Sequence, residues 1–246
     1  MKILLTNDDG INAEGILALY DALKDMAEVT IVAPDSERSA VGHGITIADP
    51  LRVKEFKRDG KVIGYSTSGT PADCVKLGVS TLMDGNPDIV VSGINAGPNL
   101  GINVLYSGTV SGAMEGAILG IPSMAVSLAS WTDCDYRFAA HHTCVLVNDI
   151  IAMKLPAGTL LNVNFPAIPE NLHRGEMFTF QSRVAWTDRY DKRIDPSKRS
   201  YYWLSGDPNA IVYEDGSDGK AVRDGYISLT PIHCDLTDWK LLEKLK

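Results

Sequence analysis

Four oxygen-bearing side chains lie at, or a few residues beyond, the ends of short apolar segments of this 246-residue chain. They are Asp8, Asp9, Ser39 and Asn95. Two adjacent carboxylates repel each other unless a cation lies between them. Mg²⁺ and Mn²⁺ are hard cations that bind oxygen ligands in an octahedral set and keep some water molecules. The four residues therefore predict a site for one divalent cation, although the Asn-Asp-Asp-Gly string at residues 7–10 is also typical of a solvated turn.

A second pattern places hydroxyl groups and glycine at the start of a predicted helix. Ser107, Gly108 and Thr109 end a glycine-rich segment that also contains Asn95. The first turn of a helix presents unpaired backbone N–H groups and partial positive charge, which suit a phosphate. We therefore expect these four residues to bind phosphate. Ordinary N-capping by Ser107 or Thr109 would explain one of the hydroxyl groups, and the absence of Gly-Lys-Ser/Thr excludes a Walker loop.

The histidines are weaker candidates. His43 stands between two glycines close to Ser39 and could donate a proton or contact a substrate, but a surface histidine without a catalytic role is at least as common. His141 and His142 fall within a predicted helix and are expected to pack or to face solvent. His233 could cap the site of its own or of a neighbouring subunit. The Gly-x-Ser-x-Gly motif of α/β-hydrolases is absent.

The elements that must position these residues alternate between strand and helix. Apolar runs predict strands at residues 2–6, 29–33, 89–92, 123–128 and 160–165. Apolar spacing or capping patterns predict helices at residues 16–23, 71–82, 109–120 and 138–153. This alternation is typical of an α/β fold with a Rossmann-like, doubly wound and mostly parallel sheet. Ligands bind such a sheet at the carboxyl ends of its strands, where the candidate residues lie.

The character of the chain changes after the last of these strands. We expect residues 1–166 to form the α/β catalytic core and residues 167–246 an extension of the same domain that takes part in oligomerisation. In the extension, residues 177–180 and 201–204 resemble exposed or edge strands. The aromatic side chains of Trp186, Tyr201, Tyr202 and Trp203 could stack on a nucleobase or simply pack. The segments 188–199 and 215–219 are predicted loops. A strand at 226–232 and a helix at 235–245 complete the predicted arm.

Bulk composition excludes some classes of partner. The chain is 45% hydrophobic and 22% charged, with a net charge of −8, so neither a nucleic-acid polymer nor an anionic membrane is an expected partner. The acidic pair at residues 8–9 interrupts the first apolar run, which is too short for a signal peptide, and we expect a cytoplasmic protein. Four widely spaced cysteines without a Cys-x-x-Cys pair predict reduced, mostly packed thiols.

Several long segments resemble the SurE family of survival-protein nucleotidases, in the order in which the family has them. They are residues 3–10 (ILLTNDDG), 33–34, 38–39, 68–75 (SGTPADCV), 87–101, 106–111 (YSGTVS), 120–123 and 230–231. The resemblance is weakest between residues 170 and 224. It implies a Rossmann-like domain with a β-hairpin extension and a C-terminal arm that subunits exchange, in a homodimer or homotetramer.

The same resemblance implies an activity and a set of site residues. The family hydrolyses nucleoside 5′- and 3′-monophosphates to nucleoside and phosphate, and some members also shorten polyphosphate. One Mg²⁺ or Mn²⁺ per subunit would be bound by the four residues that the strand ends also select. The phosphate loop of the family falls on Ser107, Gly108 and Thr109.

The expected mechanism is direct attack of water on phosphorus. The cation would lower the pKa of the water and offset charge on the phosphoryl oxygens, and Asp8 or Asp9 could accept the proton. One alternative is a phosphatase that forms an aspartyl-phosphate. Such enzymes have two aspartates separated by one residue, whereas Asp8 and Asp9 are adjacent. The other is a regulatory module that binds a nucleotide without catalysis, which would have no need for paired carboxylates.

Overall fold

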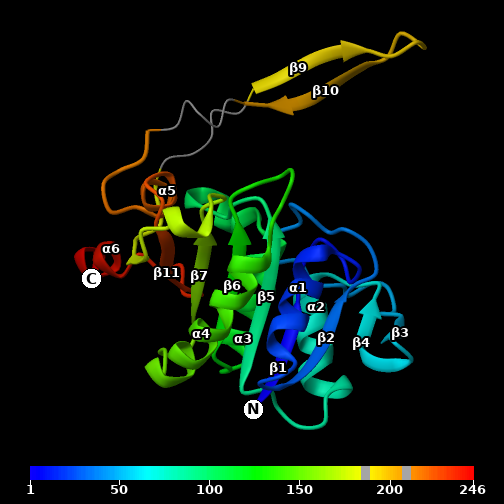
Figure 1. Ribbon diagram of the computed structural model, residues 1–246. Helices are drawn as coiled ribbons and strands as arrows, with labels where there is room; N and C mark the ends of the chain where they lie inside the picture. The colour runs from blue at the N-terminus through cyan, green and yellow to red at the C-terminus, as the bar shows by residue number, and fades with distance from the viewer. Residues whose placement is uncertain (184–188, 207–211) are drawn as a thin grey trace.

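A nine-stranded sheet runs through the centre of the molecule, with helices on both faces (Figure 1). The structure is a computed structural model that describes residues 1–183, 189–206 and 212–246. The parallel strands are β4 (Lys61–Thr67), β2 (Glu28–Pro34), β1 (Lys2–Thr6), β5 (Ile89–Ala96), β6 (Ser123–Leu128) and β7 (Thr159–Phe165). The edges add β3 (Val53–Arg58), antiparallel to β4, and then β11 (Ile227–His233) with β8 (Glu176–Phe178), where β11 is antiparallel to β7.

The central strands are apolar throughout because both of their faces are covered. In β1, Ile3 and Leu5 pack into the core on one face of the sheet, and Leu4 packs into a second core on the other face. All six residues of β6 are buried. A parallel strand between two helix layers cannot show the alternation of a half-exposed strand, which explains why the sequence shows continuous apolar runs here.

Two helices cover each face of the sheet. The helices α1 (Glu14–Leu23) and α4 (Arg137–Met153) contact each other on one face. On the other face, α2 (Pro71–Leu77), continued by the π-helical turn η1 (Gly78–Leu82), contacts α3 (Gly108–Ile118). Two 3₁₀ turns, η2 (Gly101–Tyr106) and η3 (Glu170–Leu172), lie in the connections. None of the helices in the described ranges is long and apolar enough to cross a membrane.

The chain changes direction in the sheet between β1 and β5. From β1 the chain passes through α1 to β2 on one side, whereas from β5 it passes through α3 to β6 on the other side. The connections therefore diverge at the carboxyl ends of β1 and β5 and leave a crevice there. In open α/β sheets this switch point is the usual place for a ligand.

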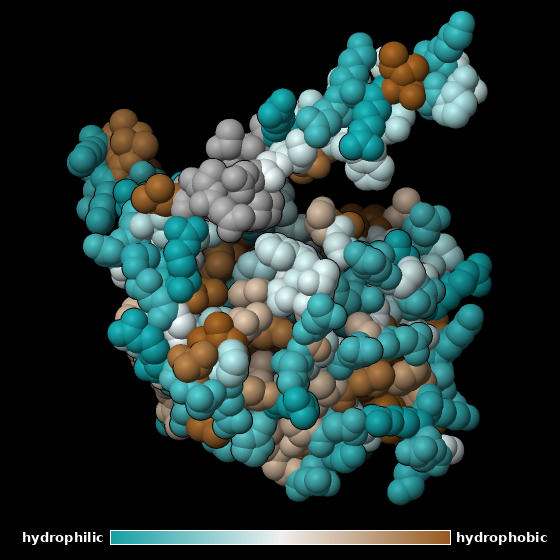
Figure 2. Space-filling model, turned by 45° about the horizontal axis from the view of Figure 1, so that its top comes forward, coloured by the Kyte–Doolittle hydropathy of each residue, from teal (hydrophilic) through white to brown (hydrophobic). Residues whose placement is uncertain are grey.

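The C-terminal part adds a hairpin and two helices. The strands β9 (Arg189–Ile194) and β10 (Ser200–Ser205) form a separate antiparallel hairpin that projects from the main body (Figure 1). The helix α5 (Asp218–Arg223) packs beside β11, and α6 (Trp239–Leu245) has no buried residue. Figure 2 shows hydrophobic side chains on the surface of the projecting hairpin.

The doubly wound, mostly parallel sheet with a hairpin extension confirms the predicted fold class. One pair of strands was missed, and two local predictions were wrong. The antiparallel pair β3–β4 was not predicted, because β3 lies at an edge of the sheet and is mostly charged. The predicted loops at 188–199 and 215–219 contain β9 and the start of α5; residue 188 lies outside the described ranges. The terminal helix begins at Trp239, not at Asp235.

The four cysteines are free thiols, as the sequence predicts. Cys74 is buried and Cys234 is exposed, with the other two between these extremes. Burial is the main cause that raises the pKa of Cys74 to about 12. This thiol therefore stays protonated at neutral pH and behaves as a packing residue.

Candidate active site

The carboxylate of Asp8 follows the carboxyl end of β1 and is 4% exposed. Its Oδ1 accepts a hydrogen bond from the hydroxyl group of Thr109, in the first turn of α3. Burial is the main reason that the pKa of Asp8 is raised to about 6; the hydrogen bond from Thr109 lowers it, and the charge of Asp9 raises it. A nearby positive charge would therefore stabilise the ionised form of this carboxylate.

Asp8 fits against α3 only because residue 108 is glycine. A Cβ atom at Gly108 would lie 2.6 Å from the Cβ of Asp8 and 2.8 Å from its Oδ2. Both distances are shorter than non-bonded contacts allow, so any larger residue would displace the helix start or the carboxylate. The glycine of the predicted phosphate loop therefore has a role in packing as well.

Asp9 connects the end of β1 with the end of β5. Its Oδ2 accepts a hydrogen bond from the backbone N–H of Ala96 at 3.2 Å. Burial raises the pKa of Asp9, the hydrogen bond from Ala96 lowers it, and the charge of Glu37 raises it again. The loops after β1 and β2 and the end of β5 all contribute to this environment.

Asn95 lies beyond an irregularity in β5. The pairing of β5 with β6 shifts between Ser92 and Asn95, so the strand continues to Ala96 where the sequence predicts an end at Ser92. Gly93 has a φ of +141°, and a Cβ there would lie 2.2 Å from the carbonyl oxygen of Val126. Irregularities of this kind re-aim side chains near active sites.

The amide of Asn95 is oriented by the backbone that follows it. Its Nδ2 donates to the carbonyl oxygen of Gly97 at 2.7 Å and, less closely, to that of Ala96 at 3.4 Å. Of the two polar atoms of a side-chain amide, only the nitrogen can donate to a carbonyl oxygen. The amide oxygen is therefore the atom left to bind a cation.

Ser39 reaches the site on the loop that follows β2. The backbone N–H of Arg38 donates to the carbonyl oxygen of Asp8 at 2.7 Å, which places Ser39 next to the loop after β1. The hydroxyl group of Ser39 donates to Oε1 of Glu37 at 2.8 Å and is exposed. Its lone pairs remain available as ligands.

The four predicted cation ligands line one pocket of about 510 Å³, together with Ser107. The pocket also has lining residues that the sequence analysis did not select, among them Asn99, Asn103, Tyr106 and Trp131. The signal that could have found Trp131 was present, because it follows the predicted strand at 123–128 and the strand-end rule applies to that strand too. Gly108 and Thr109 are buried behind Asp8.

The residues present fit a hard divalent cation. Within residues 1–183, 189–206 and 212–246, no lysine, arginine or histidine pairs with Asp8 or Asp9. In the same ranges, no three His, Cys, Asp or Glu side chains group so that they could hold a metal ion. The candidate set is therefore two carboxylates completed by a hydroxyl and an amide oxygen, a chemistry that suits Mg²⁺ or Mn²⁺ better than Zn²⁺.

The hydroxyl groups at the start of α3 have partners within the protein. The Oγ of Ser107 accepts from the backbone N–H of Val110 at 3.0 Å and so caps the helix, and the hydroxyl of Thr109 bonds to Asp8. Capping thus accounts for Ser107, the alternative that the sequence left open. The N–H of Val110 is taken up by this cap and that of Ser111 by the carbonyl oxygen of Ser107. For an anion, the N–H of Gly108 and the helix dipole remain.

The histidines do not line this pocket. His43 pairs with Glu115 at 2.9 Å and, with His233, lines a separate pocket of about 400 Å³. His141 is exposed, and His142 pairs with Glu176 at 2.7 Å. None of them is therefore placed to act directly on a ligand in the pocket that contains Asp8.

Fold and site together place the chain among doubly wound α/β proteins with an acidic, oxygen-lined site at the switch point of the sheet. A family model described as "Survival protein SurE" matches residues 3–188. A 5′-nucleotidase SurE of Syntrophus aciditrophicus is 49% identical and is covered over 93% of its length, and one of Moorella thermoacetica is 50% identical and covered over 95%. Both comparisons span 100% of this chain.

A solved structure agrees with these relatives. The crystal structure of the SurE protein from Aquifex aeolicus is similar with a TM-score of 0.88 and 42% identity, over 100% of this chain and 98% of that one. The chain therefore belongs to the SurE family, as the resemblance of its motifs implied.

Proposed function

We propose that the protein hydrolyses nucleoside 5′-monophosphates to nucleoside and phosphate, with one Mg²⁺ or Mn²⁺ per subunit. The observation that carries the proposal is the meeting of Asp8, Asp9, Ser39 and Asn95 in one pocket at the switch point of the sheet. The name 5′-nucleotidase, shared by relatives of about half identity over the full chain, supports the same activity.

The roles of the residues follow from their surroundings. The cation would be bound by the four oxygen ligands, where it would offset charge on the phosphoryl oxygens and acidify a water molecule. Thr109 holds Asp8 in place, and the N–H of Ala96 holds Asp9. One of the two carboxylates, Asp8 or Asp9, could accept the proton of the attacking water.

The phosphoryl group would lie against the first turn of α3. The N–H group of Gly108 and the positive end of the α3 helix dipole would stabilise the negative charge that develops there. Ser107 fixes this turn as its N-cap. Asn95 and Ser107 line the same pocket and could contact the same oxygens.

The nucleoside would lie at the rim, where two aromatic side chains are exposed. Tyr106 is 61% exposed and Trp131 is 59% exposed, and both line the pocket. Exposed rings beside a polar site are suited to stacking on a base. The aromatic side chains that the sequence suggested for this role, at 201–203, lie on the projecting hairpin; Trp186 lies outside the described residues.

Two features of the family resemblance stay proposals for this chain: hydrolysis of 3′-monophosphates and shortening of polyphosphate. A homodimer or homotetramer is proposed as well. Exposed hydrophobic side chains on the hairpin and on α6 support it; they include Ile194, Trp203, Leu204, Leu241 and Leu245. Light scattering on a size-exclusion column checks the oligomer. A cytoplasmic location stays a prediction.

The test is phosphate release from AMP with Mn²⁺, after EDTA treatment and after Mn²⁺ is restored. Activity should disappear with EDTA and return with Mn²⁺. Asp9→Asn should lower kcat at least about a hundredfold, since metal-assisted activation contributes several kcal/mol. The matched control is Asp25→Asn, at an exposed carboxylate of the surface. Near-full activity of Asp9→Asn would refute the proposal.

The same assay decides between the alternatives. A nucleotide-binding module without catalysis would bind AMP and release no phosphate. An aspartyl-phosphate enzyme would leave a phosphorylated protein after an acid quench, whereas direct attack by water leaves none. Replacing AMP by 3′-AMP and by short polyphosphate tests the broader substrate range.

A further inference from the structure

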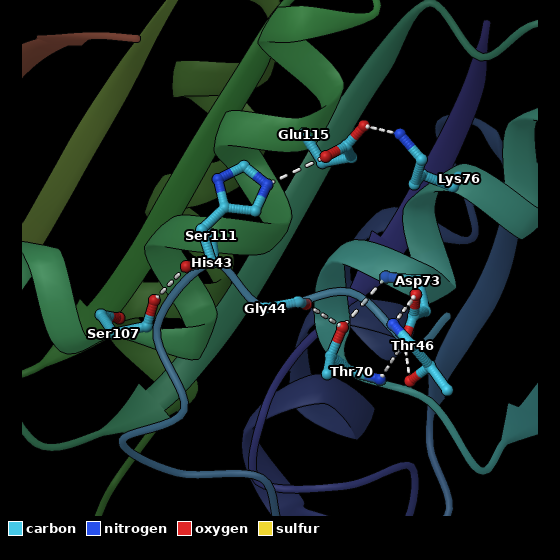
Figure 3. Close-up of polar contacts among 9 residues, drawn as sticks. All are labelled: His43, Gly44, Thr46, Thr70, Asp73, Lys76, Ser107, Ser111 and Glu115. Carbon is cyan, nitrogen blue, oxygen red and sulfur yellow. Dashed lines mark hydrogen bonds and ion pairs between the residues drawn. The ribbon is translucent and has the colours of Figure 1, made fainter. Parts of the chain in front are cut away.

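The segment after Ser39 crosses the surface without forming a helix or strand. We call residues 40–47 the strap; it runs over α3 and then over the start of α2 (Figure 3). None of its three large apolar side chains is buried in the core: Val41 is 46%, Ile45 48% and Ile47 84% exposed. Hydrophobic packing alone therefore does not fix the path of the strap, and its polar contacts contribute to it.

The strap is held at four points. The N–H of Gly42 donates to the carbonyl oxygen of Tyr106 at 3.0 Å. His43 Nε2 lies 2.9 Å from Oε2 of Glu115, and the hydroxyl of Thr70 donates to the carbonyl oxygen of Gly44 at 2.7 Å. The fourth point is at Thr46, whose hydroxyl donates to Asp73 Oδ2 at 2.7 Å and whose N–H also bonds to that carboxylate.

Among the contacts that hold the strap through one of its own side chains, the one nearest to Ser39 in the sequence is that of His43 with Glu115. This carboxylate is 3% exposed, and its Oε1 accepts from Nζ of Lys76 at 2.7 Å. A buried carboxylate is costly unless it is paired and hydrogen-bonded, and Glu115 is satisfied only with both partners in place. The pairing with Glu115 therefore holds His43 against α3 (Figure 3).

Ser39 lies between two fixed points of the backbone. On one side the N–H of Arg38 bonds to Asp8, and on the other side Gly42 and His43 are held by η2 and α3. Its own side chain bonds only to the exposed Glu37 among the contacts described. The position of the Ser39 hydroxyl thus depends on the anchors around it.

We propose that Glu115 and His43 are positioning residues that hold the Ser39 hydroxyl in the cation site. This inference rests on the proposed function, because it takes Ser39 to be a cation ligand. The helix α3 then positions two ligands at once: Thr109 holds the Asp8 carboxylate from its first turn, and Glu115 holds the strap two turns later.

The experiment measures Mn²⁺ binding without substrate, by the loss of the free-ion signal in electron paramagnetic resonance. His43→Ala should weaken binding about tenfold, the effect of one lost hydrogen bond to a charged group. His43→Gln keeps an N–H donor toward Glu115 and should restore most of the affinity. Ile47→Ala, at an exposed side chain of the same strap, is the matched control and should bind as the wild type does.

A double-mutant cycle separates positioning from general stability. In a Ser39→Ala background, His43→Ala should cost little further Mn²⁺ affinity, since the ligand it positions is gone. Equal losses in both backgrounds would overturn the inference. Hydrogen exchange of the strap amides should be faster in His43→Ala and near wild type in His43→Gln, whereas unchanged exchange in His43→Ala would overturn it as well.

The failure of this inference differs from the failure of the proposed function. If the wild type binds Mn²⁺ and Ser39→Ala weakens binding, but His43→Ala binds as the wild type does, only the positioning role is refuted. If the wild type binds no Mn²⁺, the cation site is refuted and the inference with it.

Discussion

Thr109 donates the hydrogen of its fully buried hydroxyl group to Oδ1 of Asp8. This bond joins the first turn of α3 to the loop after β1, two elements that are a hundred residues apart in the sequence. It aligns the carboxylate without neutralising it, because a hydroxyl group carries no charge. The negative charge is therefore left for a cation to offset, which is the arrangement that the proposed chemistry requires.

Removing this hydroxyl group should impair the site without unfolding the protein. Thr109→Val has a similar shape but cannot donate, so Asp8 loses the bond that orients it. We expect kcat for AMP to fall about tenfold or more, since hydrogen bonds to charged groups contribute about 1.5–3 kcal/mol. Steady-state kinetics and thermal unfolding measure the effect. Thr109→Ser should stay close to the wild type; equal activity of the Val variant would contradict this role.

The side chain of Trp131 should strengthen the binding of nucleotides but not that of phosphate esters without a base. Its indole lies against Gly97, where a Cβ would be 2.4 Å from Nε1, and it lines the pocket. Stacking on a base contributes about 1–3 kcal/mol, so Trp131→Ala should raise the KM for AMP about tenfold. The KM for ribose 5-phosphate should not change, and Trp131→Phe should recover part of the loss. An equal rise for both substrates would show that the ring does not bind the base.

Glu115 should stabilise the fold in a pH-dependent way. The hydrogen bond from His43 is the main reason that the pKa of Glu115 lies below its ordinary value of 4.5; burial opposes it and Lys76 supports it. A carboxylate with a lowered folded-state pKa contributes stability above its unfolded pKa, and loses that contribution as the pH falls through the folded value. At neutral pH, the free energy of unfolding of the wild type should thus be about 1–3 kcal/mol larger than that of Glu115→Gln.

Urea unfolding at a series of pH values checks this dependence. The difference in the free energy of unfolding between wild type and Glu115→Gln should shrink as the pH falls below 4.5. Glu243→Gln, at an exposed carboxylate of α6, should show no such difference at any pH. A difference that persisted unchanged in acid would mean that the charge of Glu115 is not what stabilises the fold.

Much of the fold could be predicted because the central strands are buried on both faces. The apolar runs at 2–6 and 123–128 coincide with β1 and β6. The strand β3 gives no such signal, since an edge strand rich in Lys, Glu and Arg resembles a loop. Likewise, the exposed hairpin strand β9 has no face in the core that would produce alternation.

The candidate site could be predicted in part, because strand ends converge in an open parallel sheet. That rule and the motifs selected the same four residues, and the structure brings them to one pocket. The partner of Thr109 could not be predicted, since the same sequence pattern at a helix start is compatible with a hydroxyl that caps the helix and with one that binds an anion. The contact of His43 with Glu115 also depends on tertiary structure alone.

The central claim is that Asp8, Asp9, Ser39 and Asn95 bind one divalent cation. The most direct measurement is an anomalous difference map from crystals of the protein soaked in MnCl₂. We predict a single strong peak per subunit in the pocket at the switch point, within coordination distance of both carboxylates and of the Asn95 amide oxygen. A map with no peak there, while phosphate release with Mn²⁺ persists in the same preparation, would contradict the claim.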